Sequence, residues 1–462
     1  LTSVYGGGAS LQALTIGGTD IDGNDITNDL TYLILETGKT MQSIEPSLAL
    51  RIHDGTPDKL LSEAVDVIQT GVGYPSLFND EALVPLLQKW GAPLEDARNY
   101  ASSGCVYMDL PAKNLVRRAL GYFVLPKALW WALHRGINPE TGEQWGVQTA
   151  DPSTFKSWED VFDAYLEQVL FFTQKHAQLE NTCRDIYTKY SPRVFLSSVL
   201  EGCIEKGKDC RQWVYPSMIN DFIITIGTTN VADSLAAIKK VVFEDKQVTL
   251  SELIDIMTHN WEGREDIRQA CLNAPKYGND DDYADLIARE VHHRTEAVIE
   301  TVKDRFGNSL RGDGSAVSAT YGLSVNTPAT PDGRKDGGYF SDSTLAPSPG
   351  ADVNGPTAVL NSCAKIDTLQ TYNHLLNQKF TPDLLEGDMK STFLGYLKTW
   401  REMRIPHVQF NVIDKKTLIK AQQEPQNHQD LIVRVAGYSA HFVDLTQGLQ
   451  DHIIARTEQN FS

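Results

Sequence analysis

The amino-acid sequence predicts an α/β fold, in which helices alternate with short buried strands. Residues 215–226 and 407–413 are rich in β-branched and aromatic residues and are therefore expected to be buried strands. Residues 312–355 are dense in Gly, Pro, Asp and Ser, which indicates loops. The spacing of apolar residues predicts helices over 57–71, 80–89, 112–134, 157–178, 231–243, 250–260, 263–273 and 281–305.

Composition narrows the classes of protein. The 462 residues carry a formal net charge of −18, which argues against non-specific binding to nucleic acid or to an anionic membrane. The sequence has no apolar run of about 18 residues that could span a membrane. The cysteines lack the paired spacing of metal ligands, so we expect reduced thiols in a cytoplasmic protein that binds no metal. They are Cys105, Cys183, Cys203, Cys210, Cys271 and Cys363.

A run of nine residues near the C-terminus, residues 432–440, reads IVRVAGYSA. Taken alone, this apolar stretch with a central glycine predicts a strand–turn–strand hairpin in which Gly437 has a positive φ. The whole run, however, resembles the signature of the glycyl radical enzymes. The resemblance implies that Gly437 stores the radical. Glycine suits this chemistry, because an α-carbon without a side chain can flatten and accept a close thiol.

A second motif, residues 102–107, resembles the cysteine loop of the same family through Ser103-Gly104-Cys105-Val106. The resemblance implies that Cys105, as a neutral thiol, gives a hydrogen atom to the glycyl radical and then attacks the substrate as a thiyl radical. The other five cysteines are interpreted as structural. The similarity continues at residues 225–235, 275–281 and 329–334.

The resemblance also implies the architecture, a ten-stranded barrel of two antiparallel half-barrels surrounded by helices. Because the chain opens at Leu1 rather than Met, we expect that an N-terminal part is missing. Residues 1–300 would form a partial pyruvate-formate-lyase-like barrel domain. Residues 301–462 would form the C-terminal glycine radical domain.

The residues beside Cys105 suggest a branch of the family. Dehydratases and decarboxylases of this family usually carry glutamate two residues after the cysteine, where this chain has Tyr107. The nearest carboxylate, Asp109, would lie roughly 6–7 Å further along an extended chain. Two adjacent cysteines, as in pyruvate formate-lyase, are absent from the sequence. These departures favour the fumarate-adding branch, and the small Gly104 favours alkylsuccinate synthase over benzylsuccinate synthase.

That branch implies a carbon–carbon bond-forming lyase, which adds an n-alkane or a toluene-like hydrocarbon to fumarate and so initiates anaerobic hydrocarbon degradation. Arg117 and Arg118, placed on the predicted helix 112–134, are the candidates for binding fumarate, with Tyr107 nearby. Adjacent helical residues point about 100° apart. Arg117 borders the apolar stripe more closely and is therefore preferred.

The alternatives are another glycyl radical lyase, such as a dehydratase, or an inactive fragment. The resemblance implies no bound cofactor, and it implies a radical S-adenosylmethionine activating enzyme that installs the radical on Gly437. It also implies a homodimer that small accessory subunits could join. Hydrocarbon would contact the apolar stretches 222–226 and 317–325.

Overall fold

The computed structural model describes residues 12–113, 119–212, 222–315, 319–371 and 373–461. Its largest sheet has six strands in the order β1-β2-β3-β10-β9-β13. Strands β1, β2 and β3 are parallel to one another, and so are β10, β9 and β13, whereas β3 and β10 pair antiparallel. The sheet therefore consists of two sets of three parallel strands that run in opposite directions and pair along β3 and β10. The six strands are β1 (Ala13–Gly17), β2 (Ser47–Ile52), β3 (Ser76–Asn79), β9 (Leu376–Phe380), β10 (His407–Val412) and β13 (Glu458–Gln459).

A second sheet consists of three parallel strands, β6 (Ala119–Val124), β7 (Phe222–Ile226) and β8 (Arg311–Asp313). All five residues of β7 are buried, and its sequence FIITI is the continuous apolar run that a strand covered on both faces requires. An isolated bridge between Gly314 and His374 joins the end of β8 to the chain just before β9. The two sheets therefore border a common interior.

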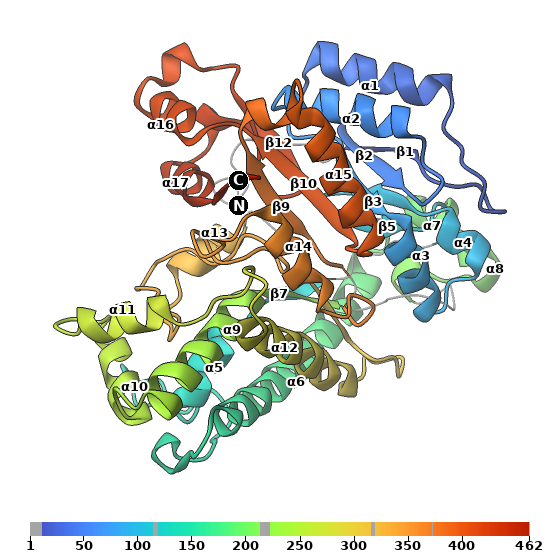
Figure 1. Cartoon of the computed structure of the whole chain (residues 1–462). Helices are drawn as coiled ribbons and strands as arrows, with labels where there is room; N and C mark the ends of the chain where they lie inside the picture. Colours follow the sequence, from blue (N-terminus) through green and yellow to red (C-terminus); the bar gives the residue numbers. More distant parts are fainter. Residues whose placement is uncertain (1–11, 114–118, 213–221, 316–318, 372, 462) are drawn as a thin grey trace.

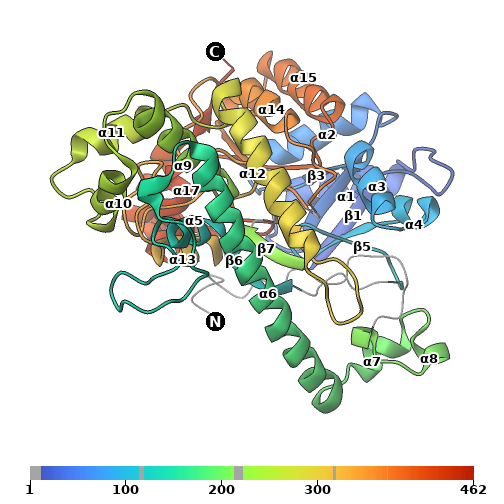
Figure 2. The same ribbon diagram turned by 90° about the horizontal axis from the view of Figure 1, so that it is seen from below.

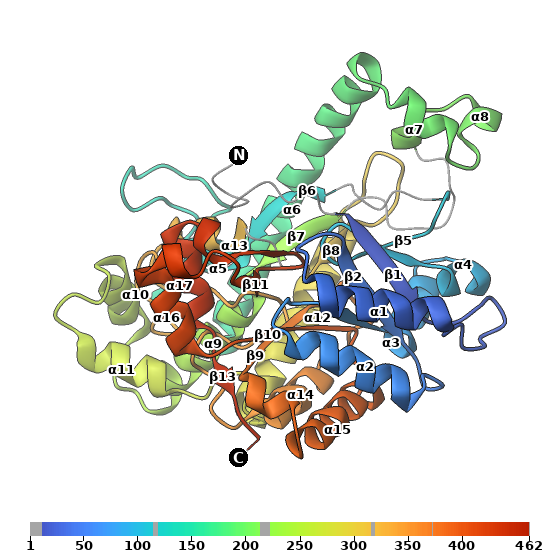
Figure 3. The ribbon, with the colours of Figure 1, turned by 90° about the horizontal axis from the view of Figure 1, so that it is seen from above.

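Helices cover both sheets. α1 (Asp29–Met41), α2 (Asp58–Gln69) and α15 (Met389–Glu402) lie along one face of the six-stranded sheet (Figure 1). The long helices α6 (Trp158–Tyr190) and α12 (Asp282–Thr301) run side by side under the three-stranded sheet (Figure 2). The C-terminal end of α6 projects from the body and leads to α7 (Val194–Ser198) and α8 (Cys203–Lys206) (Figure 3). The other helices are α3 (Asp80–Lys89), α4 (Leu94–Arg98), α5 (Leu125–Leu133), α9 (Thr228–Ala237), α10 (Leu250–Thr258), α11 (Glu265–Asn273), α13 (Ala319–Val325), α14 (Pro356–Ala364), α16 (Lys415–Gln423) and α17 (Gln447–Ala455).

Local sequence explains where these helices begin. Asn28 accepts hydrogen bonds from the backbone amides of Leu30 and Thr31 at the start of α1, and Thr249 forms a capping box with Glu252 at the start of α10. In α2 the buried residues recur at the helical period and face the sheet. None of the helices in the described ranges is long and apolar enough to cross a membrane.

The helix predicted over 112–134 is wrong over residues 119–124. Residues Ala119–Val124 form β6, and the helix α5 starts only at Leu125. Gly121 has φ +121°, which a helix cannot accommodate, and Pro126 lies in the first turn of α5, where proline is tolerated. The apolar run reads alike in a strand and in a buried helix. Arg117 and Arg118 lie outside the described residues, so the preference for Arg117 stays a prediction.

Strands on both sides of the predicted domain boundary at residue 300 share sheets, since β1–β3 pair with β9, β10 and β13, and β6 and β7 pair with β8. The boundary itself stays a prediction. The strand predicted over 407–413 is confirmed by β10, and β7 confirms the described part of the strand predicted over 215–226. The described residues within 312–355 form loops apart from the end of β8 and the helix α13.

A buried ion pair fastens the first strands together. Arg51 on β2 donates to both carboxylate oxygens of Asp80, at 3.0 and 2.7 Å, and to the carbonyl oxygen of Tyr100, at 3.1 Å. The Tyr100 hydroxyl in turn donates to Asp80 at 2.6 Å. Because β4 begins at Ala101, this network holds the entry to the loop that carries Cys105.

We expect Asp80→Asn to lower the free energy of unfolding by about 3 kcal/mol, because it leaves the buried Arg51 guanidinium without its counter-charge. Denaturant unfolding measures the change. The control is Asp58→Asn, which removes the partner of Lys398. The Asp58 side chain is 78% exposed, so little change in stability is expected. Equal stability of the two variants would contradict the anchoring role of Arg51.

Candidate active site

Two short hairpins carry the motif residues. Cys105 lies in the turn between β4 (Ala101–Ser103) and β5 (Tyr107–Asp109), which pair antiparallel. Gly437 lies between β11 (Ile432–Arg434) and β12 (Ser439–His441), also an antiparallel pair. Its φ is +79°, the left-handed conformation that glycine adopts at no steric cost.

The two turns touch. A Cβ placed on Gly437 would overlap the Cys105 side chain and would lie 2.7 Å from the Cα and 2.9 Å from the carbonyl carbon of Cys105. Any residue other than glycine would therefore push the two turns apart. The half-buried Cys105 side chain packs against two apolar groups, one containing Ala436 and the other Val435 and Tyr438. The structure thus brings together two residues that are 332 positions apart in the sequence.

Side chains from β10 hold the Gly437 turn. The Gln409 side-chain oxygen accepts hydrogen bonds from the Gly437 amide, at 3.2 Å, and from Arg434 Nε, at 2.8 Å. Asn411 accepts from the Arg434 amide and donates to the Arg434 carbonyl oxygen, both at 2.8 Å. All three side chains are buried. The turn therefore has a polar scaffold at its base and an apolar surface around the glycine.

Arg434 is the centre of this scaffold. Its guanidinium donates to the hydroxyls of Ser47, at 3.0 Å, and Ser439, at 3.4 Å, which ties the hairpin to β2. Burial lowers the pKa of Arg434 to about 10, so the side chain keeps its positive charge at neutral pH. From α17's C-terminal end, Arg456 donates to the carbonyl oxygens of Arg434, at 3.0 Å, and Val435, at 2.6 Å.

The turn of Cys105 is held separately. Asn373 donates to the Val106 carbonyl oxygen at 2.7 Å, and the Ser102 amide donates to the Thr15 hydroxyl of β1 at 2.9 Å. Asn373 directly precedes His374, the residue that bridges to the end of β8. Both sheets therefore contribute to the position of the thiol.

Tyr107, two residues after Cys105, is buried. Its ring lies 5.7 Å from that of Phe222 on β7, and its hydroxyl is 3.3 Å from the Ser315 hydroxyl. The Ser315 hydroxyl donates to Asp313 at 2.8 Å, and the Ser315 amide donates to the other oxygen of that carboxylate at 3.0 Å. A buried carboxylate at the end of β8 is thus linked to Tyr107 through one serine.

Sequence reasoning missed Gln409, Asn411, Asn373, Ser315 and Asp313. They come from three distant segments, and none belongs to a motif that was recognised. Of the sequence-predicted residues, Cys105, Gly437 and Tyr107 lie together, and Arg117 and Arg118 fall outside the described residues. The catalytic and substrate-binding roles of all five stay predictions.

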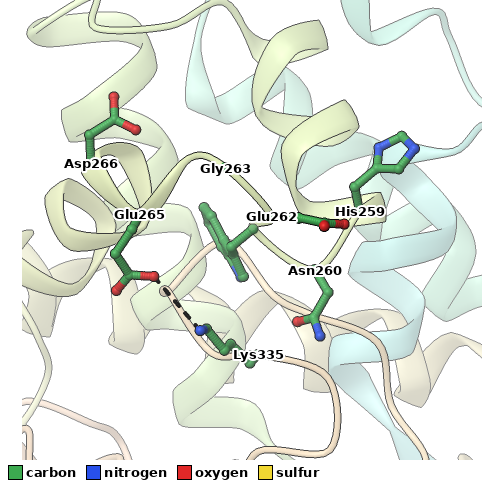
Figure 4. Close-up of a pocket in the computed structure, with 8 residues that line it drawn as sticks. His259, Asn260, Glu262, Gly263, Glu265, Asp266 and Lys335 are labelled. Atoms are coloured by element: carbon green, nitrogen blue, oxygen red, sulfur yellow. Dashed lines mark ion pairs between the residues drawn. The ribbon is translucent and has the colours of Figure 1, made fainter.

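A surface hollow of about 740 Å³ lies elsewhere, between α10 and α11 (Figure 4). It is lined by His259, Glu262, Glu265, Asp266 and Lys335 among others, and Lys335 Nζ is 3.7 Å from Glu265. Neither hairpin contributes to it. Within the ranges that the structure describes, no three His, Cys, Asp or Glu side chains form a group suited to a metal ion.

Comparison with known families agrees with the two motifs. Residues 1–323 match the family described as pyruvate formate lyase-like, and residues 341–443 match the glycine radical family. The chain belongs to the glycyl radical enzymes. Members of this family carry a radical on a glycine, which an activating enzyme installs.

Relatives of this glycyl radical enzyme include lyases and dehydratases. The chain is 39% identical to the isethionate sulfite-lyase of Nitratidesulfovibrio vulgaris, over 98% of this chain and 55% of that protein. It is 37% identical to the trans-4-hydroxy-L-proline dehydratase of Clostridioides difficile, over 97% of this chain and 57% of that protein. The B12-independent glycerol dehydratase of Clostridium butyricum, in its glycerol-bound form, superposes with a TM-score of 0.94 at 36% identity, covering 99% of this chain and 58% of that one. The chain spans about half the length of these relatives.

The expectation of fumarate addition is wrong, because these relatives are named for the release of sulfite or water. It rested on the lack of glutamate at position 107. In the tertiary structure a carboxylate from a different strand, Asp313, is linked to Tyr107 through Ser315, and position 107 alone could not indicate this neighbour. The predictions of an alkylsuccinate or benzylsuccinate synthase and of a role in hydrocarbon degradation depended on fumarate addition and are therefore not supported either.

We expect Asn411→Ala to loosen the Gly437 hairpin, since the buried Arg434 amide loses its partner and the Arg434 carbonyl keeps only its bond from Arg456, at a cost of about 1–3 kcal/mol. Hydrogen–deuterium exchange of residues 432–441 should accelerate about tenfold or more. Asn427→Ala, which removes an exposed hydrogen bond to Glu424, serves as the control. Unchanged protection of the hairpin in Asn411→Ala would show that Asn411 does not hold it.

Proposed function

We propose that this chain is the catalytic part of a glycyl radical lyase that removes a leaving group, such as water or sulfite, from a small hydroxylated substrate. The observation that carries the proposal is the contact between the turns of Gly437 and Cys105, which only a glycine permits. The names of the relatives support the reaction class, since they include a sulfite-lyase and dehydratases. This was the alternative reading of the sequence.

The proposed sequence of steps needs only these two residues for its radical chemistry. A radical S-adenosylmethionine activating enzyme removes a hydrogen atom from the Gly437 α-carbon. The glycyl radical takes a hydrogen atom from the Cys105 thiol, and the thiyl radical takes one from a substrate carbon. The substrate radical loses its leaving group from the neighbouring carbon, and the product radical regains a hydrogen atom from Cys105.

The surroundings of the two residues suit this chemistry. The apolar side chains beside Cys105 keep water away, and the hydrogen bonds from Gln409 and Asn411 fix the turn, so that the distance between thiol and glycine is set before substrate arrives. A cytoplasmic location, a homodimer and accessory subunits belong to the proposal as predictions from the sequence.

After treatment with an activating enzyme, the protein should show the doublet of a glycyl radical in electron paramagnetic resonance. Gly437→Ala should abolish the doublet. Cys105→Ser should keep the doublet and lose all turnover, because an alcohol O–H bond is too strong to pass on its hydrogen atom. A doublet that survives in Gly437→Ala would place the radical on another residue.

Air should cleave the activated chain at Gly437, because a carbon radical in the main chain traps oxygen and the backbone breaks there. Mass spectrometry should show the loss of the 25 residues that follow Gly437. The sample that has not been activated is the control and should remain whole. An intact chain after air exposure of a sample with a verified radical would contradict the assignment.

A further inference from the structure

We propose that Tyr107, Ser315 and Asp313 form a proton relay that takes the proton of the substrate hydroxyl during elimination. The proposal rests on the lyase function above and goes beyond it, because it names the acid–base group of the reaction. In the relay, Tyr107 touches the substrate, while Ser315 and Asp313 act through Tyr107.

The direction of the hydrogen bonds supports the relay. Both Asp313 oxygens accept hydrogen bonds from Ser315, one from its amide and one from its hydroxyl, as the oxygens of a carboxylate do. Since the Ser315 hydroxyl hydrogen is directed to Asp313, the Tyr107 hydroxyl is the donor across the 3.3 Å to Ser315. A phenol oxygen that donates one hydrogen bond can also accept one. The Tyr107 oxygen can therefore receive a proton while it passes its own to Ser315.

The position of the relay supports it as well. Tyr107 begins β5, two residues after Cys105, and Ser103 and Tyr107 pair across the hairpin whose turn carries the thiol. The exposed fractions of Tyr107, Ser315 and Asp313 are 3%, 1% and 0%. A carboxylate at such depth is costly unless it is hydrogen-bonded, as Asp313 is to Ser315. Its burial also shields it from bulk water. Asp313 and Ser315 lie at the end of β8, a strand of the three-stranded sheet, and so come to the Cys105 hairpin from another part of the chain.

The step is balanced as follows. Cys105 has removed a hydrogen atom from the carbon that bears the hydroxyl, so that this carbon holds the unpaired electron. The hydroxyl proton passes to the Tyr107 oxygen, the Tyr107 proton to Ser315, and the Ser315 proton to Asp313, which becomes neutral. The bond from the neighbouring carbon to the leaving group breaks, and the leaving group departs with the electron pair. A carbonyl forms, the unpaired electron moves to the neighbouring carbon, and Cys105 returns its hydrogen atom there. The proton on Asp313 leaves by the same path.

The test uses the natural gene product that contains this chain, activated and supplied with isethionate or glycerol, each of which carries a hydroxyl on the carbon next to the one that loses its leaving group. With whichever substrate turns over, Tyr107→Phe and Ser315→Ala should each lower kcat about 100-fold or more, the usual contribution of a positioned acid or base. KM should change by less than about threefold. Ser315→Thr keeps a hydroxyl and should restore kcat to within about tenfold of the parent, which a loss of packing would not predict.

A solvent deuterium isotope effect on kcat provides a second readout. It should be present in the parent enzyme and in Ser315→Thr. A purely structural role of the three residues predicts the same isotope effect in Ser315→Ala as in the parent. A larger isotope effect in Ser315→Ala, where proton transfer has become slower, supports the relay.

Tyr165→Phe is the matched control, because Tyr165 is equally buried and its hydroxyl lies 3.1 Å from the Thr295 hydroxyl in the outer helices. Its kcat should stay within about twofold of the parent. The Gly437 radical doublet should be equal in all variants. Parental kcat in both Tyr107→Phe and Ser315→Ala would overturn the relay and leave the lyase function intact. A radical doublet without turnover of any hydroxylated substrate would instead refute the lyase function, and the relay with it.

Discussion

The contact between Gly437 and Cys105 is the constraint on which the rest of the site depends. Two backbone turns can come this close only if one of them lacks a Cβ and adopts a positive φ. Each turn is short, and each is held by hydrogen bonds from a different set of segments. Gln409 and Asn411 hold the glycine turn, and Asn373 holds the cysteine turn.

Arg434 places a charged side chain next to the apolar surroundings of Gly437. Arg434 is wholly buried, and burial of a guanidinium is costly unless its donors are satisfied. Neutral oxygens of Gln409, Ser47 and Ser439 receive its hydrogen bonds, and its pKa of about 10 keeps it protonated. The cation thus links β2, β10 and the hairpin while the glycine above it remains among apolar side chains. The same arrangement holds the Gly437 turn by hydrogen bonds and leaves apolar side chains around it.

The chemistry beside the thiol depends on residues that are remote in sequence. Tyr107 is two residues from Cys105, but the carboxylate that it reaches through Ser315 lies on β8, more than two hundred residues later. The expectation of fumarate addition, which was based on Tyr107 and on the lack of two adjacent cysteines, chose the wrong branch of the family. A site built where two sheets border one interior can draw an acid–base group from any of the strands that line it.

The sequence by itself determined the family, the two motif residues and the helices α2, α3, α6 and α9 to α12, because these depend on local patterns: apolar periodicity, capping residues, and the glycine and cysteine signatures. It also determined that Gly437 would occupy a turn. Only the tertiary structure decided that the turns touch and that residues 119–124 form a strand, since an apolar run with a glycine is compatible with either element. The polar partners of the site, Gln409, Asn411 and Asp313, were likewise decided by strand pairing. Gln409 and Asn411 lie 28 and 23 residues before their partners Gly437 and Arg434, and Ser315, which links Asp313 to Tyr107, lies 208 residues after Tyr107. These side chains meet the motifs only after separate segments have packed together, so no local pattern predicts them.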